Sequence, residues 1–186
     1  LSAWSKSNSP EKPQRALAVL RRMINQSENR NHKVHADEHA YSLVINACAF
    51  SNAGPETETE AFDIAVIVLN EMVTSKDVHP TSLTYGWFIQ ACGRLNAPEP
   101  LRNAHIEQAF TRCCSKGLVN DFVLQRLRGA ASDEVYHLLM NSVLGKERFK
   151  GRLSSALPLE WTRNCSKRKV FASREVPNSP TRERYE

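Results

Sequence analysis

Three residues with metal-binding side chains, His35, Asp37 and His39, stand at alternate positions in the sequence HADEH. Imidazole nitrogens and carboxylate oxygens both bind zinc, and a structural zinc site uses four such ligands. No fourth ligand stands nearby at a zinc-like spacing, and the three residues straddle the break between two sequence units, so they need not share a face. We therefore expect no metal site and no cofactor.

The chain carries no recognisable catalytic motif. It lacks a Gly-rich phosphate loop, a nucleophile elbow, paired carboxylates in a known frame, and the HxE and PCxxC signature of the zinc deaminases. Its five cysteines form no CxxC pair, and Cys48, Cys92 and Cys113 fall where small apolar residues are expected. We expect a protein that is not an enzyme and whose cysteines stay reduced, as in cells or organelles.

Positive charge is concentrated at the C-terminal end. From Gly145 onward there are 11 Lys and Arg residues against 5 Asp and Glu, whereas the first 144 residues have 14 against 15. This segment, 145–186, reads as a basic, flexible tail that contacts phosphates without sequence preference, and the alternative is a solvated end without a binding role. The candidate phosphate contacts are Lys146, Arg148, Lys150, Arg152, Arg163, Lys167, Arg168 and Lys169. Trp161 is expected to anchor its segment on the last helices.

The elements that position these groups are repeated. The sequence YSLVINAC at 41–48 returns 44 residues later as YGWFIQAC at 85–92, and LSAW at 1–4 is a truncated copy 44 residues earlier. Each copy has apolar residues at helical spacing, and the same spacing follows in a second helix of each unit. The second-helix stripes are Ala16, Val19, Leu20, Met23; Ala65, Val68, Leu69, Met72; and Ile106, Ala109, Phe110, Cys113.

Two polar runs, 25–33 and 51–60, read as surface insertions. Without them the unit has a length in the mid-thirties, close to tetratricopeptide and pentatricopeptide repeats. The pair Glu71-Met72, the turn His79-Pro80-Thr81 and the unit end at 116–121 resemble the pentatricopeptide repeat (PPR) pattern. The resemblance implies an all-α fold, a right-handed α-α superhelix of helix-turn-helix units.

The expected domains follow from this resemblance. They are a truncated PPR unit at 1–37, a unit with an insertion at 38–81, a unit at 82–121, degenerate capping helices at 122–144 and the basic tail at 145–186. Ser132 is a good N-cap for the last expected helix. Because Leu1 already lies inside a predicted helix, we expect a C-terminal fragment of a longer array.

PPR proteins mostly bind single-stranded RNA in a mitochondrion or chloroplast, one base per repeat, where they act in RNA processing, stability or translation. The family's reading positions correspond here to Ser42 and Thr81, and to Gly86 and Asp121, while Asp37 closes the truncated unit. The base-sandwiching position corresponds to His39 and Leu83. We expect the reading side chains to face an open groove, although Gly86 has no side chain with which to read a base.

Other interpretations stay open. Ser42, Asp37 and Asp121 are also suited to cap or hydrate helix starts. The alternative function is a helical-repeat scaffold that binds protein segments. Such a scaffold could belong to a mitochondrial ribonucleoprotein, with other RNA-processing or ribosomal proteins as its partners. No apolar run reaches the roughly 18 residues of a membrane-spanning helix, so no membrane partner is expected.

Overall fold

The computed structural model describes residues 1–28, 35–52, 54–141 and 157–165. Within these ranges all regular structure is helical, which confirms the predicted all-α class. The helices are α1 (Ser2–Ser5), α2 (Lys12–Glu28), α3 (Glu38–Ala49), α4 (Pro55–Thr74), α5 (Ser82–Arg94), α6 (Glu99–Ser115), α7 (Asp121–Ala130), α8 (Asp133–Met140) and α9 (Leu159–Thr162).

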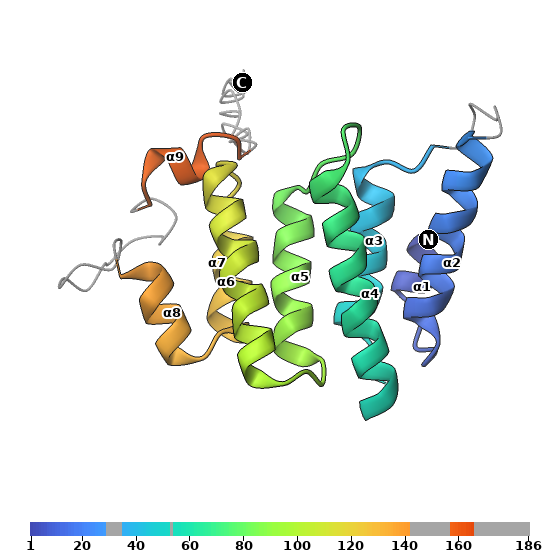
Figure 1. Cartoon of the computed structure of the whole chain (residues 1–186), viewed down its shortest axis with the longest axis horizontal. Coiled ribbons are helices and arrows are strands. Elements are labelled where there is room, and N and C mark those ends of the chain that lie inside the picture. The colour runs from blue at the N-terminus through green and yellow to red at the C-terminus, as the bar shows by residue number, and fades with distance from the viewer. Residues whose placement is uncertain (29–34, 53, 142–156, 166–186) are drawn as a thin grey trace, which may run out of the picture.

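The helices form two layers of successive pairs. α1, α3, α5 and α7 pack against one another in that order, whereas α2, α4, α6 and α8 cover one side of this row. Figure 1 shows the pairs following one another along the long axis of the molecule, from the blue N-terminal end to the orange end. We call α1, α3, α5 and α7 the first helices and α2, α4, α6 and α8 the second helices.

The apolar stripes seen in the sequence form the core between the two layers. In α3, the buried stripe residues are Val44, Ile45 and Cys48. The matching residues of α5, which are at most 1% exposed, are Phe88, Ile89 and Cys92. All four stripe residues of α4 and all four of α6 are buried as well. The predicted stripes are confirmed for α4 and α6, because a stripe with a 3.6-residue period has to face the neighbouring layer to leave water. In α2 only Ala16 and Leu20 are buried, while Val19 and Met23 are half-buried, as is Tyr41 of α3.

Three first helices start at a polar N-cap whose side chain accepts a hydrogen bond from the third helical N–H. These caps are Asp37, Thr81 and Asn120. Asp121, predicted to occupy the third cap, is instead the first residue of α7, so the predicted register is wrong by one residue there. The Asn120 side chain accepts from the Val123 N–H at 3.0 Å, which satisfies an otherwise unpaired helix-end donor.

The predicted insertion 51–60 is only partly a loop. α4 begins at Pro55, after Gly54 with φ 95°, so its first six residues fall within the run we predicted to be irregular. Proline suits the first helical position, and Glu56 and Glu58 in the first turn complement the helix dipole. Polarity misled the prediction, because helix-start residues are polar too. Similarly, α2 continues to Glu28, into the run 25–33 that was predicted to be a surface insertion.

Ser132 caps α8 as predicted, with its hydroxyl accepting from the Val135 N–H at 3.4 Å. α7 packs against α5 just as α5 packs against α3, and α8 lies against α6. A helix pair is therefore present where capping helices were expected, from Asp121 through Met140. The residues after Asn141 up to 156 lie outside the described part.

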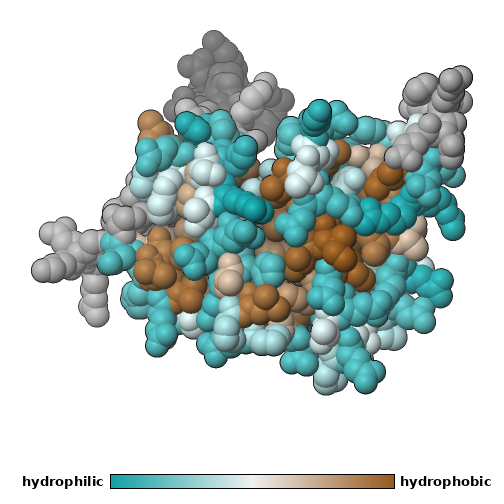
Figure 2. Space-filling model, viewed as in Figure 1, coloured by the Kyte–Doolittle hydropathy of each residue, from teal (hydrophilic) through white to brown (hydrophobic). Residues whose placement is uncertain are grey.

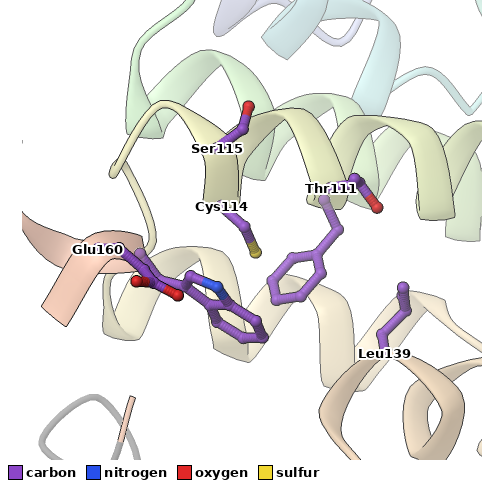
Figure 3. Close-up of a pocket in the computed structure, with 7 residues that line it drawn as sticks. Thr111, Cys114, Ser115, Leu139 and Glu160 are labelled. Carbon is purple, nitrogen blue, oxygen red and sulfur yellow. The ribbon is translucent and has the colours of Figure 1, made fainter. Parts of the chain in front are cut away.

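The segment 157–165 docks on the end of α6. The carbonyl of Trp161 accepts from the Val119 N–H at 2.8 Å, and the Gly117 carbonyl accepts from the Asn164 N–H at 2.8 Å. The Trp161 ring packs edge-on against Phe110, with centroids 5.8 Å apart. Figure 3 shows the hollow beside this contact, with Cys114 of α6 and Leu139 of α8 at its edges. This stretch is thus part of the fold, contrary to a tail flexible over its whole length.

In the helices that the structure describes, none combines the length and apolar character needed to cross a membrane.

Candidate nucleic-acid interface

Ser42, the first predicted base-reading residue, is buried between two first helices. Its side chain is 2% exposed, and its hydroxyl lies 2.7 Å from the Thr84 hydroxyl of α5. Thr84 is itself fully buried. The prediction that Ser42 faces an open groove is wrong, because the next first helix covers this side of α3.

Gly86, the matching position of α5, is covered in the same way. A Cβ atom added to Gly86 would lie 2.2 Å from a ring carbon of Phe122, which belongs to α7. The glycine allows the Phe122 ring to approach the backbone of α5 this closely. Gly86 therefore packs between helices and does not line an open groove.

The predicted unit-closing residues serve mainly as helix caps. Asp37 accepts from the Ala40 N–H at 2.8 Å, and Thr81 forms a capping box with Thr84. Asp37 is exposed, and Thr81 is half-buried. Asp121 is also exposed, next to the true cap Asn120. The interpretation of Asp37 as a cap is confirmed, and for Asp121 it is wrong.

His39 and Leu83, the predicted base-sandwiching residues, are both exposed, Leu83 at 44%. Each lies two residues after its helix cap, and in α7 the same offset from Asn120 gives Phe122. These three side chains occupy equivalent positions on consecutive helices. Phe122 was not among the predicted RNA-binding residues, because 122–144 was expected to form degenerate capping helices. Its offset from the cap Asn120 is the signal that identifies it.

Two aromatic rings and a guanidinium lie together on the shared face of α5 and α7. The Trp87 and Phe122 rings meet edge to face with centroids 6.4 Å apart, and the Arg126 guanidinium lies 4.8 Å from the Phe122 ring centre. All three side chains are half-buried, so each keeps a solvent-facing part. Aromatic faces and arginine planes are the surfaces on which unstacked bases pack.

A polar groove of about 200 Å³ continues this face toward the C-terminal ends of α5 and α7. Its polar lining residues are Gln90, Arg94, Gln125 and Arg126, and no Asp or Glu is among its lining residues. Gln90 is 9% exposed, and neither its side-chain oxygen nor the Arg126 Nε has a hydrogen-bond partner among the described residues. Such groups favour a polar ligand or water in the groove.

Small residues shape the same groove. A Cβ at Gly93 would lie 2.5 Å from the Ala130 Cβ, so the two helices approach closely there, whereas a Cβ at Gly129 would meet nothing within 4 Å. The open space beside Gly129 is therefore free for a ligand. We call the surface formed by Trp87, Gln90, Arg94, Phe122, Gln125, Arg126 and Gly129 the α5–α7 face.

Positive charge extends from the α5–α7 face toward the N-terminal end. Arg94 donates to the Asn52 side-chain oxygen at 3.2 Å and lies 5.7 Å from the Phe50 ring centre. Burial, and then the nearby charge of Arg94, lowers the pKa of Lys12, whose ammonium donates to the Ser7 carbonyl at 3.2 Å. The cations thus lie near the ends of α3 and α5.

The tail residues predicted to contact phosphates mostly fall outside the described part: Lys146, Arg148, Lys150, Arg152, Lys167, Arg168 and Lys169. Arg163 is described and exposed. Its guanidinium donates to the Ser115 carbonyl at 3.4 Å, at the end of α6. It belongs to the docked segment, where a cation near helix C-terminal carbonyls is favourable.

The metal-like pattern at 35–39 does not form a cluster. Asp37 is engaged in capping, and in the described ranges no three His, Cys, Asp or Glu side chains gather closely enough to hold an ion. Burial raises the pKa of Cys92 and of Cys114 to about 12 and that of Cys48 and Cys113 further still, so these thiols remain protonated at neutral pH.

No family model, curated protein or solved structure matches the chain. The functional assignment of the α5–α7 face therefore depends on its own geometry and chemistry.

Proposed function

We propose that the protein binds single-stranded RNA on the α5–α7 face. The observation that carries the proposal is the cluster of Trp87, Phe122 and Arg126 beside the groove at Arg94, which has no acidic lining residue. The rings offer a surface for unpaired bases, and the two guanidinium groups offer donors to phosphates. Bases in a duplex are already stacked and paired, so this arrangement favours a single strand.

The buried amide of Gln90 adds a means of selection. Its unpaired oxygen accepts hydrogen bonds, and the exposed amide of Gln125 at the same groove both donates and accepts. Amide side chains read base edges through paired donor and acceptor groups. The proposal therefore places base selection at these two residues and not at Ser42 or Gly86, which are covered by neighbouring helices.

The family, the handed superhelix and the organelle belong to the same proposal. Successive helix pairs with equivalent caps at Asp37, Thr81 and Asn120 support a PPR-type solenoid. In such an array the RNA would be held passively, in a mitochondrion or chloroplast, to protect it, direct its processing or guide its translation. The proposal assigns binding to the chain and no catalytic step.

The test is binding of the chain to fluorescently labelled RNA, measured by anisotropy across a salt series. The double variant Arg94→Gln, Arg126→Gln should weaken binding of an unstructured RNA pool at least tenfold and lower the salt slope by about 0.7 per lost phosphate contact. Arg128→Gln is the matched control, because Arg128 lies on α7 but contacts the Tyr136 ring and lies outside the groove.

Two outcomes would overturn the proposal. Equal affinity for single-stranded and duplex RNA would show that only phosphates are contacted. Equal losses for Arg128→Gln and for the groove variants would show that total charge matters and the face does not. Circular dichroism at the assay temperature separates these results from unfolding of a variant.

A protein-binding scaffold is the second candidate, and exposed apolar side chains favour it. Leu83 is 44% exposed next to Trp87 on α5, and Ile67 of α4 and Leu138 of α8 are 48% and 67% exposed. Figure 2 shows apolar surface over the middle of α4 and over α8, on the side of the second helices. Absence of RNA binding together with specific peptide binding weakened by Leu83→Ser would select this function.

A further inference from the structure

A second pocket lies beside α5 and has no lining residue in common with the α5–α7 face. It has a volume of about 460 Å³, within the range of small-ligand sites, and lies among α4, α5, α6 and the docked segment 157–165. Its polar lining residues are His79, Tyr85, Arg112, Lys116 and Asn164. None of its lining residues is an aspartate or a glutamate.

Tyr85 is the deepest polar group of this pocket. The residue is 2% exposed, and it lines the pocket. Burial, chiefly, raises the pKa of Tyr85 to about 12, while Arg112 opposes this shift from nearby. The phenol therefore stays protonated at neutral pH and can donate a hydrogen bond in a pocket that also contains two cations.

The preceding repeat provides an internal comparison. Tyr41 occupies the same position in α3 as Tyr85 in α5, four residues after its cap. Beside Tyr41, the guanidinium of Arg21 is paired with the carboxylate of Glu71 through two hydrogen bonds, one of 2.7 Å. The cation of that site is thus neutralised within the protein.

In the next repeat no carboxylate stands at the position of Glu71. Glu71 directly precedes the buried Met72 of α4, and the residue directly preceding the equivalent buried Cys113 of α6 is Arg112. The carboxylate position has become a guanidinium, and Lys116 adds a second cation one turn later. Neither cation takes part in an ion pair within the described ranges. The pocket therefore carries two cations without a carboxylate from the described part of the chain to balance them.

We propose that this pocket binds a phosphate monoester. Arg112 and Lys116 would bind the phosphate oxygens, and the Tyr85 hydroxyl would donate a third hydrogen bond. Three donors and two positive charges suit a dianion with three terminal oxygens better than a carboxylate, which has two oxygens and one charge. The remaining lining residues, Val73, Pro80 and Leu118, form an apolar wall for the body of the ester.

The phosphate monoester has two possible sources, a free mononucleotide or the terminal phosphate of an RNA strand. The inference does not depend on the proposed function, because the pocket shares no residue with the α5–α7 face. A mononucleotide site and a terminal-phosphate site predict different ligands, so one set of titrations distinguishes them.

The experiment is calorimetric titration of the whole chain with a nucleoside monophosphate, the matching nucleoside, inorganic phosphate, and short RNAs with a 5′-phosphate or a 5′-hydroxyl. The proposal expects the monophosphate to bind at least tenfold more tightly than the nucleoside. Preference for the 5′-phosphorylated RNA over both the mononucleotide and the 5′-hydroxyl RNA would identify a strand end as the source.

Arg112→Glu restores the acidic residue of the preceding repeat and should reduce monophosphate affinity at least tenfold. Tyr85→Phe keeps the buried ring and should reduce the affinity about fivefold through loss of one hydrogen bond. Arg22→Gln is the matched control, because Arg22 precedes Met23 of α2 at the equivalent position and is exposed. Thermal melts check that each variant is folded.

Equal affinities for nucleotide and nucleoside would overturn the proposal, as would unchanged monophosphate binding by Arg112→Glu. An equal loss for Arg22→Gln would also overturn it, since the effect would then come from net charge. Because Tyr85→Phe removes only one oxygen, the proposal remains testable even where Arg112→Glu fails to fold.

Discussion

The hydroxyls of Ser42 and Thr84 lie 2.7 Å apart between α3 and α5, both buried. Thr84 also accepts from the Thr81 N–H at 2.9 Å, so the pair connects one first helix to the cap of the next. Two residues separated by 42 positions thus join consecutive units through a buried polar contact. Buried hydroxyls require such partners, because an unpaired one is costly.

Ser42→Ala should therefore reduce stability. The loss leaves Thr84 with one partner fewer, and we expect a decrease of about 1 kcal/mol in the free energy of unfolding. Urea unfolding measures it, with the exposed Ser2→Ala as control, expected to stay within about 0.5 kcal/mol of the wild type. A double-mutant cycle with Thr84→Val should give a nonzero coupling energy. Loss of RNA affinity without loss of stability would contradict this structural role.

Gly86→Ala should destabilise the contact between α5 and α7. The new methyl group would lie 2.2 Å from the Phe122 ring, which then has to move, at a cost of about 1–3 kcal/mol. Gly129→Ala is the matched control, since its Cβ meets nothing within 4 Å and alanine favours a helix by up to about 1 kcal/mol. Thermal melts should shift in opposite directions for the two variants. A shift in the same direction for both would contradict the close approach of Phe122.

Stability should fall as the solution becomes alkaline. Burial raises the pKa of Cys92 and Cys114 to about 12, from an ordinary value of 9.0 in the unfolded chain. Because the thiol holds its proton more tightly in the folded state, its contribution to stability is complete below pH 9. This contribution is lost as the pH rises from 9 toward 12, where the unfolded chain has released the proton and the folded protein still holds it. Each such thiol should lower the free energy of unfolding by about 1.4 kcal/mol at pH 10 relative to pH 7.5.

Urea titrations at pH 7.5, 9 and 10 test this pH dependence. The variant Cys92→Ala should start from a lower stability, because a small cavity forms, but should show a shallower decline with pH. Slow labelling of the native thiols by an alkylating reagent at pH 8 is a second readout, since the thiolate is the reactive form. A stability that is flat from pH 7.5 to pH 10 would contradict the burial of these thiols.

The helices and their core stripes were predictable because they depend on local periodicity. The spacing of Val44, Ile45 and Cys48 places them on one helix face whatever the neighbours are. Cap residues were predicted less well. Asn and Asp both suit a cap, so the run Asn120-Asp121 did not define the start of α7. The structure decided it, because the Val123 N–H donates to the Asn120 side-chain oxygen. A polar loop and a polar helix start have similar compositions, so the start of α4 at Pro55 was not predicted.

The surface of the first helices could be decided only by tertiary structure. The position of α5 decides which side of α3 is covered. Ser42 is buried on that side, although it lies outside the apolar stripe of α3. Likewise Phe122 covers Gly86 across 36 positions of sequence, and Arg112 meets Tyr85 only because α6 folds back on α5. The sequence by itself determined the helix pairs, since periodicity is local. Packing between helices decided which polar groups are exposed and which charges lack a partner, because burial is a property of the assembled layers.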